Sequence, residues 1–184
     1  MIKKILQVTA EELNTINLDK YLKSTDDLGF PKGWFYMDAG LEHYRLLAFI
    51  STLVNGATLL DIGSYQGSSA IALSFNKKNK VISYDIKHQP EIADIKIPNI
   101  QFIKGNVLMH EIASPFIMLD TYHNGEFEQK FANHLLKINY KGLVMFDDIY
   151  LNNEISNFWN GLKNEKYDLT HIGHHTGTGI AIYD

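Results

Sequence analysis

The residues of this sequence best suited to chemistry are acids and a histidine that follow two short apolar runs. Asp120 ends one run and His123 comes three residues later, while Asp147 and Asp148 end another run. Histidine has a near-neutral reference pKa, so it can take a proton from a hydroxyl group, which is a poor nucleophile at neutral pH. Carboxylate oxygens are hard ligands suited to Mg²⁺. The pattern predicts proton abstraction by His123 beside Asp120, with Asp120, Asp147 and Asp148 as candidate ligands of Mg²⁺.

The same residues also have a purely structural interpretation. His123 could begin the helix expected from residue 126, and Asp147 and Asp148 could cap helices or anchor hydrogen bonds. The sequence alone therefore leaves both the base and the metal as hypotheses.

A turn typical of cofactor-binding α/β proteins lies between Leu59 and Ala70. An apolar run stops at Asp61, and Gly63 and Gly67 then bracket a tight turn into small residues. Gly63 lets the chain turn sharply after a strand, and Gly67 lets a helix approach the sheet closely. Tyr65 occupies the position at which a dinucleotide fingerprint has its second glycine. The turn therefore favours a cofactor other than a dinucleotide.

Polar residues also end the next two expected strands. Asp85 lies about 20 residues past the glycine turn, where an acid typically accepts ribose hydroxyls, and Gly105-Asn106 ends the following run. Because ligands of parallel sheets bind beyond the carboxyl ends of the strands, we expect these residues and the acids above to share one site.

The elements that must position these residues alternate between strand and helix from Thr58 onwards. The runs are apolar on both faces, which indicates a parallel sheet covered on both sides. Strands are expected at Thr58–Ile62, Lys80–Tyr84, Ile100–Ile103, Phe116–Leu119, Leu143–Phe146, Tyr167–Ile172 and Gly179–Tyr183, and helices at Ser68–Phe75, Glu126–Ile138 and Glu154 to about Lys163. The last two strands lie close together around Gly173 and Gly177, which suits an antiparallel hairpin.

Helices are also expected before the glycine turn. Thr9 and Glu12 form a capping box, and Asp38 can cap a second helix that ends at about Val54. The first helix is expected to place these residues on its apolar side: Leu13, Ile16, Leu18, Tyr21 and Leu22. A loop over residues 26–40 carries aromatic residues that could cover a substrate together with His43: Trp34, Phe35 and Tyr36.

Length and composition are those of an ordinary globular protein. The chain has 184 residues, of which 45% are hydrophobic and 21% charged, and a net charge of −4. These values predict one domain. In a parallel α/β fold with its ligand site at the strand ends, the helices of residues 1–55 are expected to cover the substrate side and residues 56–184 to form the cofactor-binding core. They predict no partner among nucleic acids or membranes. The chain has no cysteine, which excludes disulfides and thiolate metal sites, and no sequence window predicts a membrane span or a signal peptide, so we expect a cytoplasmic location.

The order of these residues resembles the class I S-adenosylmethionine-dependent methyltransferases. The resemblance rests on Asp61-x-Gly63-x-x-x-Gly67, Asp85, Gly105-Asn106, Asp120 and Asp147-Asp148, and it covers about residue 56 to the C-terminus. It implies an α/β, Rossmann-like three-layer sandwich whose seven-stranded, mostly parallel sheet ends in an antiparallel hairpin strand. It also implies that the cofactor is bound by Asp61, Gly63, Ser64, Tyr65, Gly67, Ser68, Asp85, Asn106 and Asp120, with the ribose on Asp85 and the adenine near Asn106. Family members usually carry an acid in place of Asn106.

Within that family, the sequence is most similar to the metal-dependent small-molecule O-methyltransferases, of the catechol type and the sugar-modifying type. In the catechol type, an acid after the fourth strand and an acid–amide or acid–acid pair after the fifth strand hold magnesium. In the related sugar-modifying enzymes, a histidine three positions after the first acid is the base. Asp120-x-x-His123 and Asp147-Asp148 match that second pattern, whereas the lysine base of the catechol type has no counterpart beside Asp120. The resemblance implies methylation of a hydroxyl on a small sugar-like or aromatic acceptor.

Other functions stay open from the sequence alone. A nicotinamide-dependent oxidoreductase would need glycines close to a pyrophosphate, where Ser64, Tyr65 and Gln66 intervene. A non-catalytic module on the same scaffold would bind the cofactor without turnover. Methylation of nucleic acid is disfavoured by the acidic balance, and a homodimer is compatible with the short chain.

Three further histidines lie close together near the C-terminus: His171, His174 and His175. Zinc binding by this group is disfavoured, because His174 and His175 would point to opposite faces of a strand. We expect a surface turn or a hairpin edge at the rim of the site.

Overall fold

Strands and helices alternate along the chain from residue 58, as the sequence predicts. The computed structural model describes residues 1–18 and 41–184. It contains five mutually parallel strands: β1 (Thr58–Ile62), β2 (Lys80–Asp85), β3 (Ile100–Lys104), β4 (Phe116–Leu119) and β5 (Gly142–Asp147). Two antiparallel strands complete the sheet, β6 (Lys166–Asp168) and β7 (Thr178–Tyr183).

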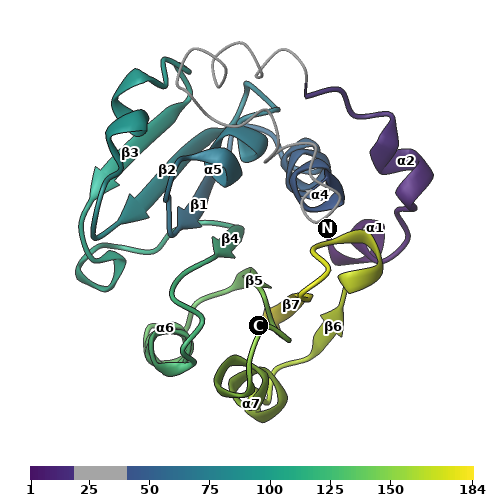
Figure 1. Ribbon diagram of the computed structural model, residues 1–184, viewed down its shortest axis with the longest axis vertical. Coiled ribbons are helices and arrows are strands. Elements are labelled where there is room, and N and C mark those ends of the chain that lie inside the picture. The colour runs from purple at the N-terminus through teal and green to yellow at the C-terminus, as the bar shows by residue number, and fades with distance from the viewer. Residues whose placement is uncertain (19–40) are drawn as a thin grey trace.

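The strand order creates the edge at which ligands bind in such sheets. The seven strands lie in the order β3-β2-β1-β4-β5-β7-β6 (Figure 1). The chain therefore adds β2 and β3 on one side of β1 and then places β4 and β5 on the other side. In open α/β sheets, ligands bind outside the carboxyl ends of the strands at this switch point. The residues that follow β1, β2, β4 and β5 are therefore gathered at one edge.

Helices cover both faces of the sheet, which confirms the three-layer, Rossmann-like prediction. One face carries α1 (Ile2–Ile5), α2 (Ala10–Asn14), α4 (Leu41–Thr52) and α5 (Ser68–Leu73), and the other carries α6 (Glu126–Lys137) and α7 (Asn153–Gly161) (Figure 1). Successive residues of β1 alternate between the two cores: Leu59 packs with the first group of helices and Leu60 with the second. The central strands β1, β4 and β5 are thus buried on both faces, as their apolar runs predict, whereas β3 and β6 at the two edges of the sheet are partly exposed.

Two predicted elements are shorter than expected, because side chains bond to the backbone and end them. The helix that begins at Thr9 ends at Asn14, where the hydroxyl and the N–H of Thr15 both donate to the carbonyl of Glu12, at 2.7 and 3.1 Å. The strand expected at Tyr167–Ile172 stops at Asp168, whose carboxylate accepts the N–H of Thr170 at 2.8 Å and starts a 3₁₀ turn.

Other differences are small or lie outside the described residues. The short helix α1 was not expected, and the remaining boundaries shift by one or two residues, as helix and strand ends commonly do. The predictions for Tyr21, Leu22, the loop at 26–40 with its three aromatic residues, and the Asp38 cap lie outside the described residues. No helix in the two described ranges is long and apolar enough to cross a membrane.

Candidate active site

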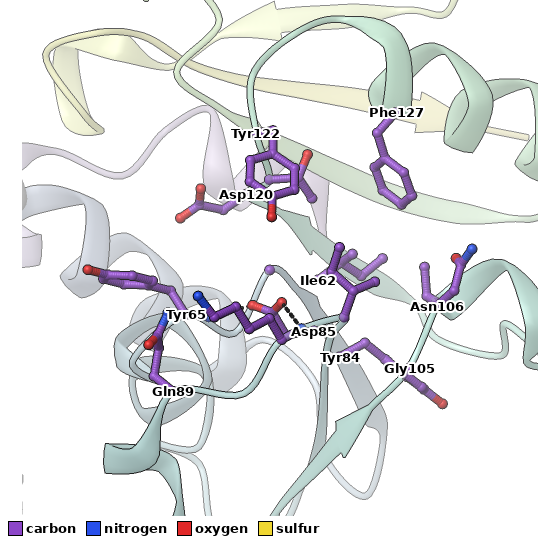
Figure 2. A pocket seen from close by; sticks show the side chains of 15 residues that line it. Ile62, Tyr65, Tyr84, Asp85, Gln89, Gly105, Asn106, Asp120, Tyr122 and Phe127 are labelled. Atoms are coloured by element: carbon purple, nitrogen blue, oxygen red, sulfur yellow. Dashed lines mark hydrogen bonds between the residues drawn. The ribbon is translucent and has the colours of Figure 1, made fainter.

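A cavity of about 470 Å³ opens at the carboxyl ends of β1 to β4. Figure 2 shows Asp85 and Tyr65 on one side of this space and Asp120 and Tyr122 on the other. Its volume is within the range of small-molecule sites. The residues that line it are Ile62, Gly63, Tyr65, Tyr84, Asp85, Ile86, Lys87, Gln89, Gly105, Asn106, Val107, Asp120, Thr121, Tyr122 and Phe127. Five predicted cofactor residues are thus brought together: Gly63, Tyr65, Asp85, Asn106 and Asp120.

Gly63 allows two strand ends to meet at the floor of this cavity. Its φ is +95°, and a Cβ built on it would lie 1.5 Å from the carbonyl oxygen of Asp120. The N–H groups of Gly63 and Ser64 donate to the carbonyl of Tyr84, at 2.8 and 3.2 Å, and fix the turn. Only glycine fits both the conformation and the space at this position.

Asp85 is fixed as an acceptor at the end of β2. Its Oδ2 accepts the N–H of Tyr65 at 2.9 Å, and its Oδ1 accepts the N–H of Lys87 at 2.9 Å. A carboxylate has about four acceptor positions. Asp85 can therefore hold the glycine turn and still accept hydrogen bonds from a diol.

The far end of the cavity combines an amide with flat apolar surfaces. Asn106 Oδ1 accepts the N–H of Leu108 at 3.0 Å, which leaves its NH₂ group as a donor, and Tyr84, Val107 and Phe127 supply apolar walls. Such a pocket suits a planar heterocycle with an acceptor on its edge.

Four predicted cofactor residues do not line the cavity. Asp61 is fully buried, and its Oδ2 accepts the hydroxyl of Ser83 at 2.5 Å, which also contacts the Ser64 hydroxyl at 2.5 Å. Burial raises the pKa of Asp61 to about 7, although hydrogen bonds from Ser83 and Ser69 oppose the shift. Asp61 and Ser64 therefore lie beneath the turn.

Gly67 and Ser68 lie at the start of α5. A Cβ on Gly67 would come within 2.6 Å of Ile95 and 3.1 Å of Phe102, so this glycine permits close packing toward β3. Ser68 hydrogen-bonds Tyr44 of α4. Both residues therefore pack against neighbouring elements and do not line the cavity.

A second group of polar residues lies at the ends of β4 and β5. We call His43, Asp120, His123, Asp147, Asp148 and His174 the histidine–aspartate cluster. His43 comes from α4, Asp120 and His123 from the segment after β4, Asp147 and Asp148 from the end of β5 and the residue after it, and His174 from the turn before β7. Asp120 belongs to this cluster and also lines the cavity.

His123 lies between two carboxylates. Its Nε2 is 3.1 Å from Asp120 Oδ1 and 3.4 Å from Asp148 Oδ2. The side-chain amide of Asn152 donates to the His123 carbonyl at 2.9 Å and fixes the loop. Burial lowers the pKa of His123, but the hydrogen bond and charge of Asp120, with the charges of Asp148 and Glu128, outweigh burial and raise it above its usual value.

Asp148 is held by the turn that precedes β7. His174 Nδ1 lies 2.8 Å from its Oδ1, and the Thr176 hydroxyl donates to the same oxygen. Burial raises the pKa of Asp148, but these hydrogen bonds and the charges of His123 and His174 lower it overall. His174 therefore lies at the rim of the site, as expected for a hairpin edge, whereas His171 and His175 are exposed.

Asp147 and His43 face each other in the interior. Asp147 Oδ1 lies 3.5 Å from His43 Nδ1 and 3.8 Å from His174 Nδ1. The two residues are 8% and 3% exposed. Burial and the charges of Asp120 and Asp148 raise the pKa of Asp147, whereas burial lowers the pKa of His43 to about 4.

The backbone around both regions is strained. Four non-glycine residues in the described chain have positive φ, and three lie here: Tyr65 at 41°, His123 at 51° and Asp148 at 56°. Such conformations cost free energy and gather at functional sites. The fold holds these side chains at the strand ends despite that cost.

The predicted metal ligands are only partly grouped. In the described chain, Asp147 and Asp148 form a possible three-donor cation site with His174, whereas Asp120 contacts His123. Of the residues expected to cover a substrate, His43 reaches the cluster, where its Nδ1 lies 3.5 Å from Asp147 Oδ1.

Several residues of the site have only a weak signal in the sequence or none. Ile86, Lys87 and Gln89 follow Asp85 directly, so their nearness to a strand end could have indicated them. Tyr122 and Phe127 flank His123 in the sequence, and that proximity is the available signal. Glu128 is buried, accepts the Thr121 hydroxyl at 2.7 Å and carries no distinctive sequence signal.

Comparison with known proteins identifies structural relatives. No family model matches the sequence, and no curated protein matches it. Among solved structures, an O-methyltransferase from Bacillus cereus in complex with SAH is 16% identical, with a TM-score of 0.60, and the match covers 91% of this chain and 90% of that chain. The SAH-bound methyltransferase PaMTH1 from Podospora anserina is 15% identical, with a TM-score of 0.60 and coverage of 92% and 97%. The O-methyltransferase TomG from Streptomyces achromogenes, involved in tomaymycin synthesis and solved with SAM, is 14% identical, with a TM-score of 0.59 and coverage of 90% and 88%. The chain therefore has the Rossmann-like fold of these methyltransferases over nearly their whole length.

Proposed function

We propose that this protein is an S-adenosylmethionine-dependent methyltransferase that methylates a hydroxyl group of a small molecule. The observation that carries the proposal is the position of Asp120, which lines the cavity and also contacts His123. A cofactor site and a candidate base thus share one residue at the switch point of the sheet.

The chemistry of the cavity fits the proposed cofactor. Asp85 can accept the two ribose hydroxyls, Asn106 can donate to the adenine edge, and Gly63 lets the ligand approach the backbone beside Asp120. When bound, S-adenosylmethionine supplies a methyl group on a positively charged sulfur. We assign Asp61, Ser64, Gly67 and Ser68 to the same site as residues that support the turn.

His123 would remove the proton of the acceptor hydroxyl. Carboxylates only accept hydrogen bonds when ionised, so Asp120 and Asp148 at Nε2 favour the tautomer with its proton on Nε2. Nδ1 is then the basic atom, and the carboxylates stabilise the imidazolium that forms when it takes the proton. Positioning and proton removal supply the catalysis.

The proposed Mg²⁺ on Asp120, Asp147 and Asp148 fits the donor set only in part. Asp147 and Asp148 offer carboxylates, but the third donor beside them is the imidazole of His174, and Asp120 is engaged by His123. Mg²⁺ prefers an all-oxygen shell. The mechanism above therefore includes no step through Mg²⁺.

Further parts of the proposal concern the setting of the reaction. We propose that the chain acts as one domain on a sugar-like or aromatic acceptor, in the cytoplasm, without nucleic-acid or membrane partners, either alone or as a homodimer. The helices of residues 1–55 would cover the substrate side, for which His43 of α4 at the cluster is the supporting observation.

The proposal is tested by binding and turnover with the wild-type protein. We expect isothermal titration calorimetry to show binding of S-adenosylhomocysteine and none of NAD⁺. We expect radiolabelled methyl transfer from S-adenosylmethionine to at least one member of a library of hydroxylated small molecules. Binding of NAD⁺ instead would support the oxidoreductase alternative, and cofactor binding without any transfer would support a non-catalytic module.

A further inference from the structure

Asp147, Asp148 and His174 bring three potential metal ligands together at the end of β5. One donor atom from each lies within 4.8 Å of the other two. His174 Nδ1 is 2.8 Å from Asp148 Oδ1 and 3.8 Å from Asp147 Oδ1. Two ligands bound at about 2.0–2.1 Å with tetrahedral angles are roughly 3.3 Å apart, so small side-chain movements would let one cation reach all three.

Two buried polar atoms, one in a ligand of this group and one in the neighbouring His43, lack a hydrogen-bond partner among the described residues. They are Asp147 Oδ1 and His43 Nδ1, which face each other at 3.5 Å. A buried carboxylate oxygen without a partner is costly, so native proteins seldom leave one unsatisfied. A cation bound to Asp147 would satisfy this oxygen.

The donor types indicate which cations fit. Mg²⁺ prefers oxygen ligands, whereas imidazole nitrogen suits zinc and other first-row transition metals. Asp120 does not belong to the group of donor atoms that lie within 4.8 Å of one another, and its Oδ1 is 3.1 Å from His123 Nε2 instead. His174, in contrast, already contacts Asp148.

Neighbouring side chains support these three donors from outside. The Thr176 hydroxyl donates to Asp148 and contacts His174 Nδ1 at 2.5 Å, so it can hold both residues in place. His43 lies behind Asp147, and its ring centre is 5.9 Å from that of His174. Supporting contacts of this kind orient metal ligands in proteins.

We infer that Asp147, Asp148 and His174 form a mixed nitrogen–oxygen site for a transition-metal dication such as Zn²⁺ or Mn²⁺, with His43 as a positioning residue for Asp147. Metal binding through His174 Nδ1 uses the neutral imidazole with its ring proton on Nε2, because the ligating nitrogen must offer its lone pair. The inference concerns metal binding alone and does not rest on methyl transfer.

Metal affinity in matched variants tests the inference. Chelator-treated protein is titrated with Zn²⁺, Mn²⁺ and Mg²⁺ in a calorimeter, as wild type, His174→Ala and the exposed control His171→Ala. We expect His174→Ala to weaken Zn²⁺ binding by about 100-fold or more and Mg²⁺ binding by less than about 3-fold, because only the nitrogen ligand is lost. His171→Ala should match the wild type for both.

A spectroscopic measurement identifies the ligand directly. Cu²⁺ bound to the wild type should show the electron spin echo modulation of a coordinated imidazole, and His174→Ala should lose it. Absence of Zn²⁺ binding by the wild type, equal Zn²⁺ affinity in His174→Ala and His171→Ala, or an unchanged imidazole signal would overturn the inference.

Two controls separate these results from misfolding and from a wrong functional proposal. Thermal denaturation and titration with S-adenosylhomocysteine are recorded for each protein, because the cofactor cavity lies around Asp85 and away from His174. If His174→Ala does not fold, Asp147→Asn replaces it and should weaken Zn²⁺ binding to a similar extent. Loss of cofactor binding with intact metal binding would contradict the proposed function alone.

Discussion

The cavity around Asp85, in which we propose that the cofactor binds, and the histidine–aspartate cluster occupy the same edge of the sheet but differ in how they are built. In the cavity, polar side chains are hydrogen-bonded by nearby backbone: Asp85 accepts two N–H groups and Asn106 accepts one. In the cluster, residues from distant segments meet, and buried atoms of Asp147 and His43 lack partners among the described residues. Backbone N–H groups thus position the polar side chains that line the cavity, whereas the cluster contains facing side chains with two unpaired buried atoms among the described residues.

This difference suggests that the two regions have different tasks, cofactor binding and chemistry. A cavity whose polar side chains are already held in place can bind a cofactor without rearrangement. A cluster of carboxylates and imidazoles with perturbed pKa values is suited to moving a proton or holding a cation. Changes in the cavity should therefore weaken cofactor binding, and changes in the cluster should weaken turnover or metal binding.

The largest effect is expected from Gly63→Ala in the cavity. The new Cβ would clash with the Asp120 carbonyl at 1.5 Å in a backbone with φ of +95°, so β1 and β4 would have to separate. We expect a loss of about 4 kcal/mol or more in the free energy of unfolding, measured with urea, and no detectable binding of S-adenosylhomocysteine. The control is Gly161→Ala, whose Cβ would meet nothing within 4 Å. Equal stability of the two variants would show that the two strand ends do not meet as described.

The next largest effect is expected from His123→Ala in the cluster. Removal of the proposed base should lower turnover by about two to four decades, while the dissociation constant of S-adenosylhomocysteine changes by less than about 3-fold. Turnover is measured with an acceptor that the wild type methylates, and His171→Ala is the matched control. Unchanged turnover would remove His123 from the mechanism, and loss of cofactor binding would show that the cavity and the cluster are not separable.

An effect of intermediate size is expected on the pH dependence of the free energy of unfolding when Asp61, the buried acid beneath the cavity, is replaced by asparagine. The pKa of Asp61 is raised from 3.8 to about 7, so the folded protein retains a proton that the unfolded chain releases. The resulting stabilisation is full below about pH 4 and is lost as the pH rises to about 7. Between pH 5 and pH 8, the wild type should lose roughly 2.5 kcal/mol of unfolding free energy relative to Asp61→Asn, which is neutral throughout. Exposed Asp94→Asn should follow the wild type, and parallel stability curves for all three proteins would contradict the shift.

The smallest effect is expected from Asp85→Ala. The variant loses the acceptor for the ribose and the anchor of the Tyr65 N–H. We expect the dissociation constant of S-adenosylhomocysteine to rise by about 10- to 100-fold, which corresponds to the loss of hydrogen bonds to a charged group. Calorimetric titration beside exposed Asp94→Ala provides the comparison. An affinity equal to that of the control would place the ribose elsewhere.

The two regions also differ in how well the sequence predicts them. The strands and the glycine turn follow from short apolar runs and from spacing within one segment, so their bounds and the positions of Asp85 and Asn106 could be predicted. The early ends of α2 and β6 could not be predicted, because individual hydrogen bonds made by Thr15 and Asp168 override the apolar pattern.

The cluster depends on contacts that spacing does not encode. His123 beside Asp120 could be predicted because three residues separate them on one loop. The approach of His43 to Asp147 and of His174 to Asp148 depends on how α4 and the turn before β7 pack against the end of β5. The third donor of the possible cation site was therefore assigned to Asp120 from the sequence, whereas the structure places His174 there.

A crystal structure of the protein with S-adenosylhomocysteine would show whether the cavity and the cluster act together. We expect the ribose on Asp85, the adenine beside Asn106, and the sulfur directed past Asp120 toward His123. A ligand bound elsewhere, or one whose sulfur points away from His123, would contradict the claim that the cavity and the cluster form one active site.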